Sequence, residues 1–339
     1  MEGELWVMDR SLPPSRFSGL VLSYDIGGTK VHAGVVDPKG RVLAEERVLV
    51  DFSVGRDQVI RQWVAVGRRV LASKPGLSRR VRRVGVASAG PLDPIAGKLL
   101  DPTNFGGWGV VPLARLLSRG LSERGIARKV VLENDAAAAI LAEHWVGGAR
   151  RLDDALVMTL GTGLGTGILA NGRLVRAGRH LHTEGGHVIL KAGDDSARCG
   201  CGNLGCAEAY LSGRGFSRRA EARLGAGVGD AAEIARKARE GDAPCRELFA
   251  EYSELLAVAI HNFAVLYAPR KVILAGSFAA AADLFLEPAR VRLEQLLMRR
   301  RHGVDFLPKL EVSRLGNRSG LLGGAYVAFS QTASSSPGR

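Results

Sequence analysis

The sequence has no hydrophobic run long enough to cross a bilayer, which excludes a protein anchored by a transmembrane helix. Residues 1–19 lack the apolar core of a secretory signal and contain Glu2, Glu4 and Asp9 instead. We expect this stretch to be a disordered leader, and the serine-rich residues 330–339 to be a disordered tail. Only four cysteines occur in 339 residues, and their spacing suits a metal site and not a disulfide framework. We therefore expect a protein of the reducing cytoplasm that has no membrane partner.

Basic residues exceed acidic ones, and the formal net charge is +13. The positive charge concentrates at residues 79–83 and 299–301. Neither run is interleaved with aromatic side chains or belongs to a recognisable nucleic-acid-reading module. We therefore expect no specific nucleic-acid partner and attribute the charge to solvated helix faces. A basic surface could still attract anionic substrates.

A strand–turn–strand pattern occurs twice along the chain. Residues 20–26, 31–36 and 41–48 predict a meander, and further strands are expected at 81–87 and 130–132. Helices are expected at 56–72 and 136–145, the second capped by Asn134. Strand 155–160 restarts the pattern, the hairpin turn Asn171-Gly172 follows, and another strand is expected at 271–274.

This duplication predicts two similar α/β lobes with a ligand cleft between them. We expect a small lobe at 20–145, completed by a closing helix at 319–329, and a large lobe at 146–318.

Cysteines cluster in one place. Cys199, Cys201 and Cys206 fall within eight residues, and His187 precedes the first of them by twelve. Three thiolates and an imidazole are a common ligand set for structural Zn²⁺. A reduced, buried cysteine cluster is the alternative, but the interspersed glycines favour a loop folded around an ion. Cys245 lies outside the cluster, in a charged helical stretch.

Glycine turns follow predicted strands at three positions. In the first, Asp25 ends a strand and is followed by Ile26, Gly27, Gly28, Thr29 and Lys30. Such a turn lets backbone N–H groups approach phosphate oxygens, while Asp25 could hold Mg²⁺ through water. Gly161, Thr162 and Gly163 form a second turn about 135 residues later, and Gly276 marks a third. Taken alone, the first turn could instead be a plain hairpin, but two opposed turns could hold a triphosphate from both lobes. Neither of the first two turns matches a P-loop or a dinucleotide fingerprint.

Together these motifs resemble the ROK family, the sugar kinases and sugar-responsive repressors of the actin-like, ribonuclease H-like ATPase superfamily. The resemblance extends from about residue 20 to 328. The segments that carry it are the turn at 25–30, Asp-Pro-Thr-Asn at 101–104, Glu-Asn-Asp-Ala at 133–136, the turn at 161–163, Glu-Gly-Gly-His at 184–187 and the cysteine segment at 199–208.

The resemblance implies that Asp135 is the general base that accepts the proton of the attacking sugar hydroxyl. From the residues alone, Asp135 could equally be a simple helix N-cap. The resemblance also implies that the sugar hydroxyls are bound by Asn104, Asn134, Asp135, Glu184, His187 and Glu208. His187 would bind zinc through one ring nitrogen and face the sugar with the other. All four zinc positions would then be filled by protein, so the ion would be structural.

Two segments depart from the family pattern. His182 and Thr183 stand where the family often has Ala-Gly, and residues 88–91 read Ser-Ala-Gly-Pro where a Gly-x-Pro-Gly form is usual. Both lie near the expected sugar pocket, so they bear on the choice of sugar.

The expected function is an ATP-dependent hexose kinase that phosphorylates glucose at its 6-hydroxyl, with Mg²⁺ and a structural zinc as cofactors. Kinases for N-acetylmannosamine, N-acetylglucosamine or fructose are alternatives, and polyphosphate is an alternative donor. A repressor is disfavoured because only 24 residues precede Asp25, and a zinc-binding interaction module leaves the glycine turns unexplained. Family resemblance also predicts a homodimer or homotetramer. Because the turns lie far from the cysteines in sequence, loss of zinc is expected to affect ATP affinity little.

Overall fold

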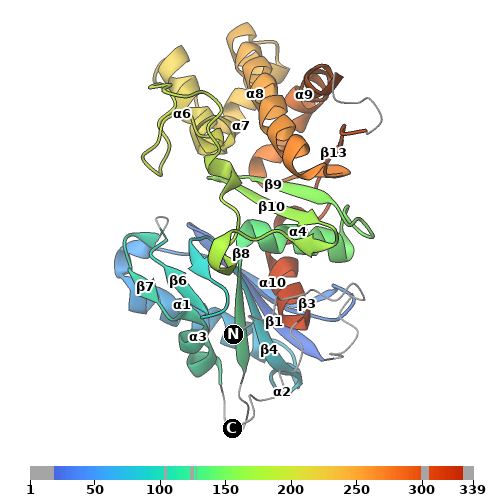
Figure 1. Ribbon diagram of the computed structural model, residues 1–339. Helices are drawn as coiled ribbons and strands as arrows, with labels where there is room; N and C mark the ends of the chain where they lie inside the picture. Colours follow the sequence, from blue (N-terminus) through green and yellow to red (C-terminus); the bar gives the residue numbers. More distant parts are fainter. Residues whose placement is uncertain (1–18, 103–104, 123–125, 127, 299–304, 331–339) are drawn as a thin grey trace. The chain divides into compact units, whose positions relative to one another are not determined.

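A computed structural model describes residues 19–102, 105–122, 126, 128–298 and 305–330. These residues form two compact units (Figure 1). The first contains the described residues of 1–150, 173–182 and 318–339. The second contains 151–172 and the described residues of 183–317. Residues 173–182 thus pack with the first unit, although the segments on either side of them belong to the second.

The first unit is built on a mixed sheet with the strand order β3-β2-β1-β4-β8. Strands β1 and β2, and β2 and β3, pair antiparallel, whereas β4 is parallel to both β1 and β8. A smaller antiparallel sheet has the order β5-β6-β7. The strands are β1 (Leu20–Ile26), β2 (Lys30–Val36), β3 (Val42–Leu49), β4 (Val81–Ser88), β5 (Leu92–Asp93), β6 (Lys98–Leu100), β7 (Val110–Val111) and β8 (Lys129–Asn134).

Helices cover both faces of this sheet, and the alternation of side chains along β1 decides which residue meets which helix. The helices of the unit are α1 (Arg56–Ala72), α2 (Leu77–Arg80), α3 (Leu113–Leu121), α4 (Asp135–Val146) and α10 (Ser319–Ser330). Tyr24 points toward α1, where its hydroxyl donates to the carbonyl of Trp63. Ser23 points to the other face and donates to the carbonyl of Leu321 in α10. Asp25 therefore shares the α10 face of the sheet.

Helix α10 packs on the sheet through glycines. A Cβ on Gly85 of β4 would lie 1.8 Å from the carbonyl oxygen of Gly324. A Cβ on Gly323 would lie 2.2 Å from the carbonyl oxygen of Ala138 in α4. Only glycine permits such close backbone approach, so these positions let α10 lie directly against β4 and α4.

The second unit repeats the plan of the first. Within 151–317 its sheet has the order β10-β9-β12-β13, with β9 and β10 antiparallel and β12 parallel to β9 and β13. The short strand β11, which begins the segment 173–182 assigned above to the first unit, pairs with β10 and extends the order to β11-β10-β9-β12-β13. Numbered within each sheet, both orders read 3-2-1-4-5, which confirms the duplication expected from the sequence. The strands are β9 (Ala155–Leu160), β10 (Leu164–Ala170), β11 (Arg173–Leu174), β12 (Lys271–Ala275) and β13 (Lys309–Val312).

An aromatic cluster forms the core among the helices of the second unit. Tyr252 and Phe249 come from α8, and both lie within ring-contact distance of Phe216, Phe278 and Phe285. The helices are α5 (Ala207–Leu211), α6 (Gly213–Leu224), α7 (Ala231–Arg239), α8 (Ala243–Tyr267) and α9 (Ala282–Leu297). In the described part of the chain, no helix combines the length and apolar character needed to cross a membrane.

Candidate functional site

The first glycine turn joins β1 to β2. The amide of Gly27 donates to the carbonyl of Lys30 over 3.0 Å, so this N–H closes the turn. The next two residues, Gly28 and Thr29, are exposed at its tip. Lys30 is also exposed, but it is the first residue of β2 and not part of the loop. The turn and the first residue of β2 thus present a glycine, a hydroxyl and an ammonium group to solvent.

Asp25 lies beneath the start of α10. A Cβ on Gly320 would lie 2.4 Å from the Cγ of Asp25 and within 2.7 Å of both carboxylate oxygens. Burial of the group and the negative charge of Asp135 raise the pKa of Asp25 to about 6, while Lys30 and Arg47 oppose the shift. The two carboxylates therefore lie near enough to interact electrostatically, although they come from the ends of different strands.

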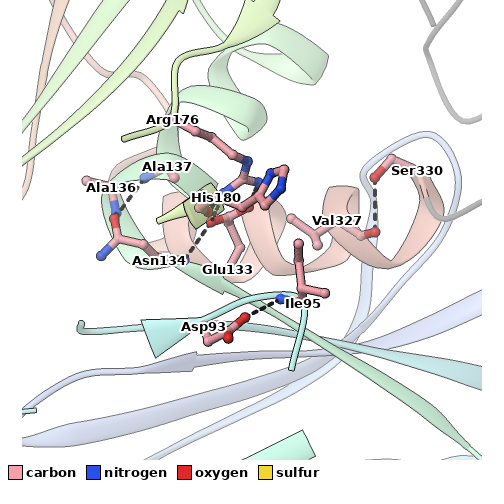
Figure 2. Close-up of polar contacts among 10 residues, drawn as sticks. All are labelled: Asp93, Ile95, Glu133, Asn134, Ala136, Ala137, Arg176, His180, Val327 and Ser330. Atoms are coloured by element: carbon pink, nitrogen blue, oxygen red, sulfur yellow. Dashed lines mark hydrogen bonds and ion pairs between the residues drawn. The ribbon is translucent and has the colours of Figure 1, made fainter. Parts of the chain in front are cut away.

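Asp135 is the first residue of α4, directly after the N-cap. The side-chain oxygen of Asn134 accepts from the amides of Ala136 and Ala137 over 3.0 and 3.1 Å (Figure 2). The alternative that Asp135 is only an N-cap is therefore wrong, since Asn134 caps the helix. The Asp135 carboxylate is held by the Ala136 amide at 2.8 Å and stays partly exposed at the positive end of α4.

Glu133, the residue before Asn134, forms a buried ion pair. Glu133 is 2% exposed and accepts from the Asn134 amide over 3.0 Å. Its carboxylate pairs with the guanidinium of Arg176, which also donates to the carbonyl of His180 (Figure 2). Arg179 and His180 both have positive φ, an uncommon conformation for residues other than glycine. The segment 173–182 is thereby fastened beside the start of α4.

The two segments that depart from the family pattern contact each other. His182 is buried, and its ring fills the space beside Gly90. A Cβ on Gly90 would lie 2.5 Å from Cε1 and 2.6 Å from Nε2 of His182, and 3.4 Å from Nδ2 of Asn134. The imidazole and the glycine are therefore sterically matched, immediately next to the residue that caps α4.

In the second unit, glycine segments converge at the ends of β9 and β12. These strands are parallel neighbours, so their carboxyl ends share one edge of the sheet. Gly161 closes its turn by donating to the carbonyl of Gly163 over 3.0 Å, and it accepts from the amide of Gly213 over 2.8 Å. Gly276 has φ +93°, and a Cβ there would lie 2.4 Å from the carbonyl oxygen of Leu160. Thr162 is exposed at the tip of the turn.

The structure brings His187, Cys199, Cys201 and Cys206 together as the sequence predicts. One ligand atom from each lies within 4.8 Å of every other. The sulfurs of Cys201 and Cys206 are 3.7 Å apart, and the sulfur of Cys199 is 3.5 Å from Nδ1 of His187. Cys245, buried on α8, is not part of this cluster.

These spacings fit a tetrahedral zinc site. With Zn–S bonds of about 2.3 Å and Zn–N bonds of about 2.0 Å, tetrahedral ligand atoms are roughly 3.5–3.8 Å apart. The donor set of three sulfurs and one imidazole nitrogen also suits zinc and not a hard cation such as Mg²⁺. The four residues could hold the ion without a water ligand, which is the arrangement of a structural site.

The segment that carries His187 is a tight turn packed on β10. Glu184 precedes the short 3₁₀ helix η4 (Gly185–His187), and its carboxylate is 3.8 Å from Nε2 of His187. Thus Nδ1 faces the cysteines and Nε2 faces Glu184. A Cβ on Gly185 would lie 2.4 Å from the hydroxyl of Thr166, and one on Gly186 would lie 2.0 Å from the carbonyl oxygen of Leu164. Both glycines are required for this approach.

The predicted site residues fall into two groups, one in each unit. In the first unit Asp25, which precedes the turn at 27–30, lies within electrostatic range of Asp135, which directly follows Asn134. Asn104 lies outside the described residues. The second unit contains the other predicted residues, in its glycine turns and its zinc loop. They are Gly161, Thr162, Gly163, Glu184, His187, Cys199, Cys201, Cys206, Glu208 and Gly276. Gly320 and Arg176 were not among the predicted site residues. The glycine at the start of a predicted helix was a signal for the first, but nothing in the pattern indicated the second.

Comparison with known proteins gives this arrangement a family. The ROK family model matches residues 21–331. The glucokinase of Streptomyces coelicolor is 30% identical over 328 residues, covering 91% of this chain and 98% of that protein. The N-acetyl-D-glucosamine kinase of Pectobacterium carotovorum is also 30% identical, and the match covers 90% of this chain and 97% of that protein. The xylose repressor of Caldicellulosiruptor bescii is 26% identical and covers 90% and 77%.

Solved structures agree with the sequence comparison. A ROK family glucokinase from Streptomyces griseus in complex with glucose and AMPPNP has 30% identity and a TM-score of 0.76, covering 92% of this chain and 100% of that one. A ROK hexokinase from Thermus thermophilus has 32% identity and a TM-score of 0.74, covering 91% and 98%. These likenesses confirm the predicted fold class. This chain belongs to the ROK family.

Proposed function

We propose that this protein is an ATP-dependent hexose kinase and that glucose is its substrate. The observation that carries the proposal is the pair formed by Asp25 and Asp135, whose charges interact beside an exposed glycine turn. Phosphoryl transfer needs one carboxylate near the nucleophile and a second that helps to hold the metal and phosphates. The relatives named glucokinase and the complex with glucose and AMPPNP support the same substrates.

In the proposed reaction, the 6-hydroxyl oxygen of the sugar attacks the γ-phosphorus of ATP. A new O–P bond forms, the bond between the γ-phosphorus and the bridging oxygen breaks, and ADP leaves. Asp135 accepts the hydroxyl proton through its carboxylate. The N-terminal end of α4 favours the ionised form of that carboxylate before the proton arrives.

Carboxylate oxygens suit Mg²⁺, which prefers hard oxygen donors and retains several waters. We assign Asp25 to this ion, through water, as the sequence predicts. Bound Mg²⁺ would neutralise charge on the phosphates during transfer. Packing of Gly320 against Asp25 fixes the carboxylate in place, so the protein orients this group before any ligand binds.

The phosphates of ATP are assigned to the two glycine turns and Gly276. In the first unit these residues are Gly27, Gly28, Thr29 and Lys30, of which Thr29 and Lys30 add a hydroxyl and a positive charge. In the second unit they are Gly161, Thr162, Gly163 and Gly276. Exposure of Gly28, Thr29, Lys30 and Thr162 supports the assignment because a ligand can reach them.

The sugar is assigned to Asn104, Asn134, Asp135, Glu184, His187 and Glu208. Both helix-capping bonds of Asn134 use its side-chain oxygen, so its amide NH₂ is the group that can donate to a hydroxyl. The Nε2 of His187 is turned away from the cysteines toward Glu184, as a shared role in zinc and sugar binding requires.

A coupled assay of ADP release tests the proposal. Purified protein with ATP and Mg²⁺ should release ADP in the presence of glucose, and the rate should exceed the rate without sugar. The panel includes fructose, N-acetylglucosamine and N-acetylmannosamine, which are the alternative hexoses. Polyphosphate, the alternative donor, releases no ADP, so with this donor the sugar phosphate itself is measured. Sugar-independent ADP release, or none with any sugar, would contradict a hexose kinase.

The contact between Gly90 and His182 gives a prediction about sugar choice. Gly90→Ala should lower kcat/KM for glucose and destabilise the fold by roughly 1–3 kcal/mol, because the new methyl group collides with a buried ring. Adding His182→Ala should restore much of both losses, since the smaller side chain makes room. Enzyme kinetics and thermal unfolding of the two single variants and the double variant measure this coupling.

His182→Ala alone is the informative control for substrate preference. Removing the imidazole opens space beside Asn134, so the ratio of kcat/KM for N-acetylglucosamine to that for glucose should rise by about tenfold. An unchanged ratio, with additive effects in the double variant, would show that these residues do not select the sugar.

The expected cytoplasmic location and the homodimer or homotetramer remain predictions. So does the absence of a specific nucleic-acid partner, because a xylose repressor is among the relatives.

A further inference from the structure

Glu208 lies between the zinc loop and the second glycine turn. It is the second residue of α5, a short helix whose N-cap is the zinc ligand Cys206. One carboxylate oxygen of Glu208 is 3.4 Å from the sulfur of Cys199, and the other accepts the amide of Leu164 over 3.0 Å. The side chain therefore contacts a predicted zinc ligand and the residue that directly follows the turn at 161–163.

The turn is shaped to accept this carboxylate. A Cβ on Gly163 would lie 2.6 Å from the Glu208 oxygen that bonds Leu164, so only glycine leaves room for the contact. On the opposite side, the carbonyl of Leu164 lies against Gly186, the neighbour of His187. Leu164 thus contacts Glu208 through its amide and Gly186 through its carbonyl. Glu208 is two residues from Cys206, and Gly186 is next to His187.

The chain beyond α5 reaches the same turn. Ser212 follows α5 and caps α6 by accepting the amide of Gly215. Gly213, the first residue of α6, donates its amide to the carbonyl of Gly161 over 2.8 Å. Both ends of α5 are consequently attached to the turn, one through a side chain and one through the backbone. A shift of α5 caused by loss of the ion would move the turn with it.

We infer that Glu208 is a positioning residue for the Gly161–Gly163 turn and that it couples the zinc loop to nucleotide affinity. The inference rests on the proposed function, which assigns this turn to ATP phosphates. It reverses the expectation, drawn from distance in sequence, that loss of zinc affects ATP affinity little. It also gives Glu208 a task in addition to sugar binding, because the Leu164 contact exists without a sugar.

Binding of ADP, measured by calorimetry without sugar, tests the coupling. In the zinc-loaded protein, Glu208→Ala should weaken ADP affinity about tenfold, because it removes the acceptor of the Leu164 amide. Glu208→Gln should stay within about threefold of wild type, since its carbonyl can accept that amide and its NH₂ can donate to a cysteine thiolate. Glu221→Ala, an exposed acid on α6, is the matched control and should not change the affinity.

Removal of zinc by a chelator supplies the second arm. Wild-type ADP affinity should fall about tenfold, whereas Glu208→Ala should lose no more than about threefold further, because its coupling is already broken. Near-UV circular dichroism confirms that the stripped protein is folded; if it unfolds, the comparison of the zinc-loaded Ala and Gln variants decides. KM for ATP should rise in Glu208→Ala in step with the ADP dissociation constant.

Three results would overturn the inference. The first is an ADP affinity of Glu208→Ala equal to that of wild type. The second is a loss of ADP affinity on zinc removal that is equally large in Glu208→Ala and in wild type. The third is a Gln variant as weak as the Ala variant, which would deny the role of the acceptor. If the zinc-loaded wild-type protein binds no ADP, both the inference and the proposed kinase function are contradicted. If it binds ADP and the affinity changes neither with Glu208→Ala nor with zinc removal, only the coupling is contradicted.

Discussion

Asp135→Asn is expected to lower kcat for glucose phosphorylation by at least ~10²-fold, the lower range for loss of a general base. Asparagine keeps an oxygen that can accept the Ala136 amide, so the start of α4 should be preserved. It also removes the negative charge that raises the pKa of Asp25. Relief of that repulsion should leave the melting temperature unchanged or slightly higher. Steady-state kinetics and thermal unfolding measure the two effects.

The combination of lost turnover and retained stability separates a chemical role from a structural one. Asp57→Asn is the matched control, because Asp57 is also an acid in the first turn of a helix in the same unit. It should leave kcat within about twofold of wild type, as expected for an exposed surface change. Turnover of Asp135→Asn close to that of the control would remove Asp135 from the mechanism.

Strands, glycine turns and zinc ligands could be predicted because each depends on residues close together in sequence. The hairpin between β1 and β2 is encoded by two largely apolar segments that are separated by Gly27 and Gly28. Cys199, Cys201 and Cys206 lie within eight residues, so a loop alone can bring them together. The cap on α4 was likewise visible, because Asn134 stands immediately before a run of alanines.

Contacts between distant segments could not be predicted. Gly320 packs on Asp25 across almost 300 residues, and a glycine near a helix start does not by itself indicate which residue packs against it. Arg176 pairs with Glu133 because the segment 173–182 folds back onto the first unit, which no local periodicity encodes. For Glu208, the family resemblance implied a sugar ligand, but only the folded structure shows that its carboxylate accepts the Leu164 amide.

Cys201→Ser is expected to have the second large effect, on metal content and stability. Wild-type protein should contain about one zinc per chain, as a closed site with four protein ligands implies. Loss of one thiolate should reduce that content severely, because a serine hydroxyl is a poor ligand for this ion. Structural zinc contributes directly to folding free energy, so the melting temperature should fall by at least about 5 °C. Elemental analysis and thermal unfolding measure both.

Kinetics of the same variant should follow the contacts of the loop. The sugar KM should rise, because the ion orients His187 and the neighbouring Glu184, and the KM for ATP should rise too if α5 carries the disturbance to Leu164. Cys245→Ser removes a buried thiol of the second unit that lies outside the cluster. It should keep its zinc and both KM values, although burying a hydroxyl costs some stability of its own. Wild-type protein without zinc would exclude the four-ligand site, as would a loss of zinc in Cys245→Ser equal to that in Cys201→Ser. Either result would also remove the reason for expecting the zinc loop to order the turn at 161–163.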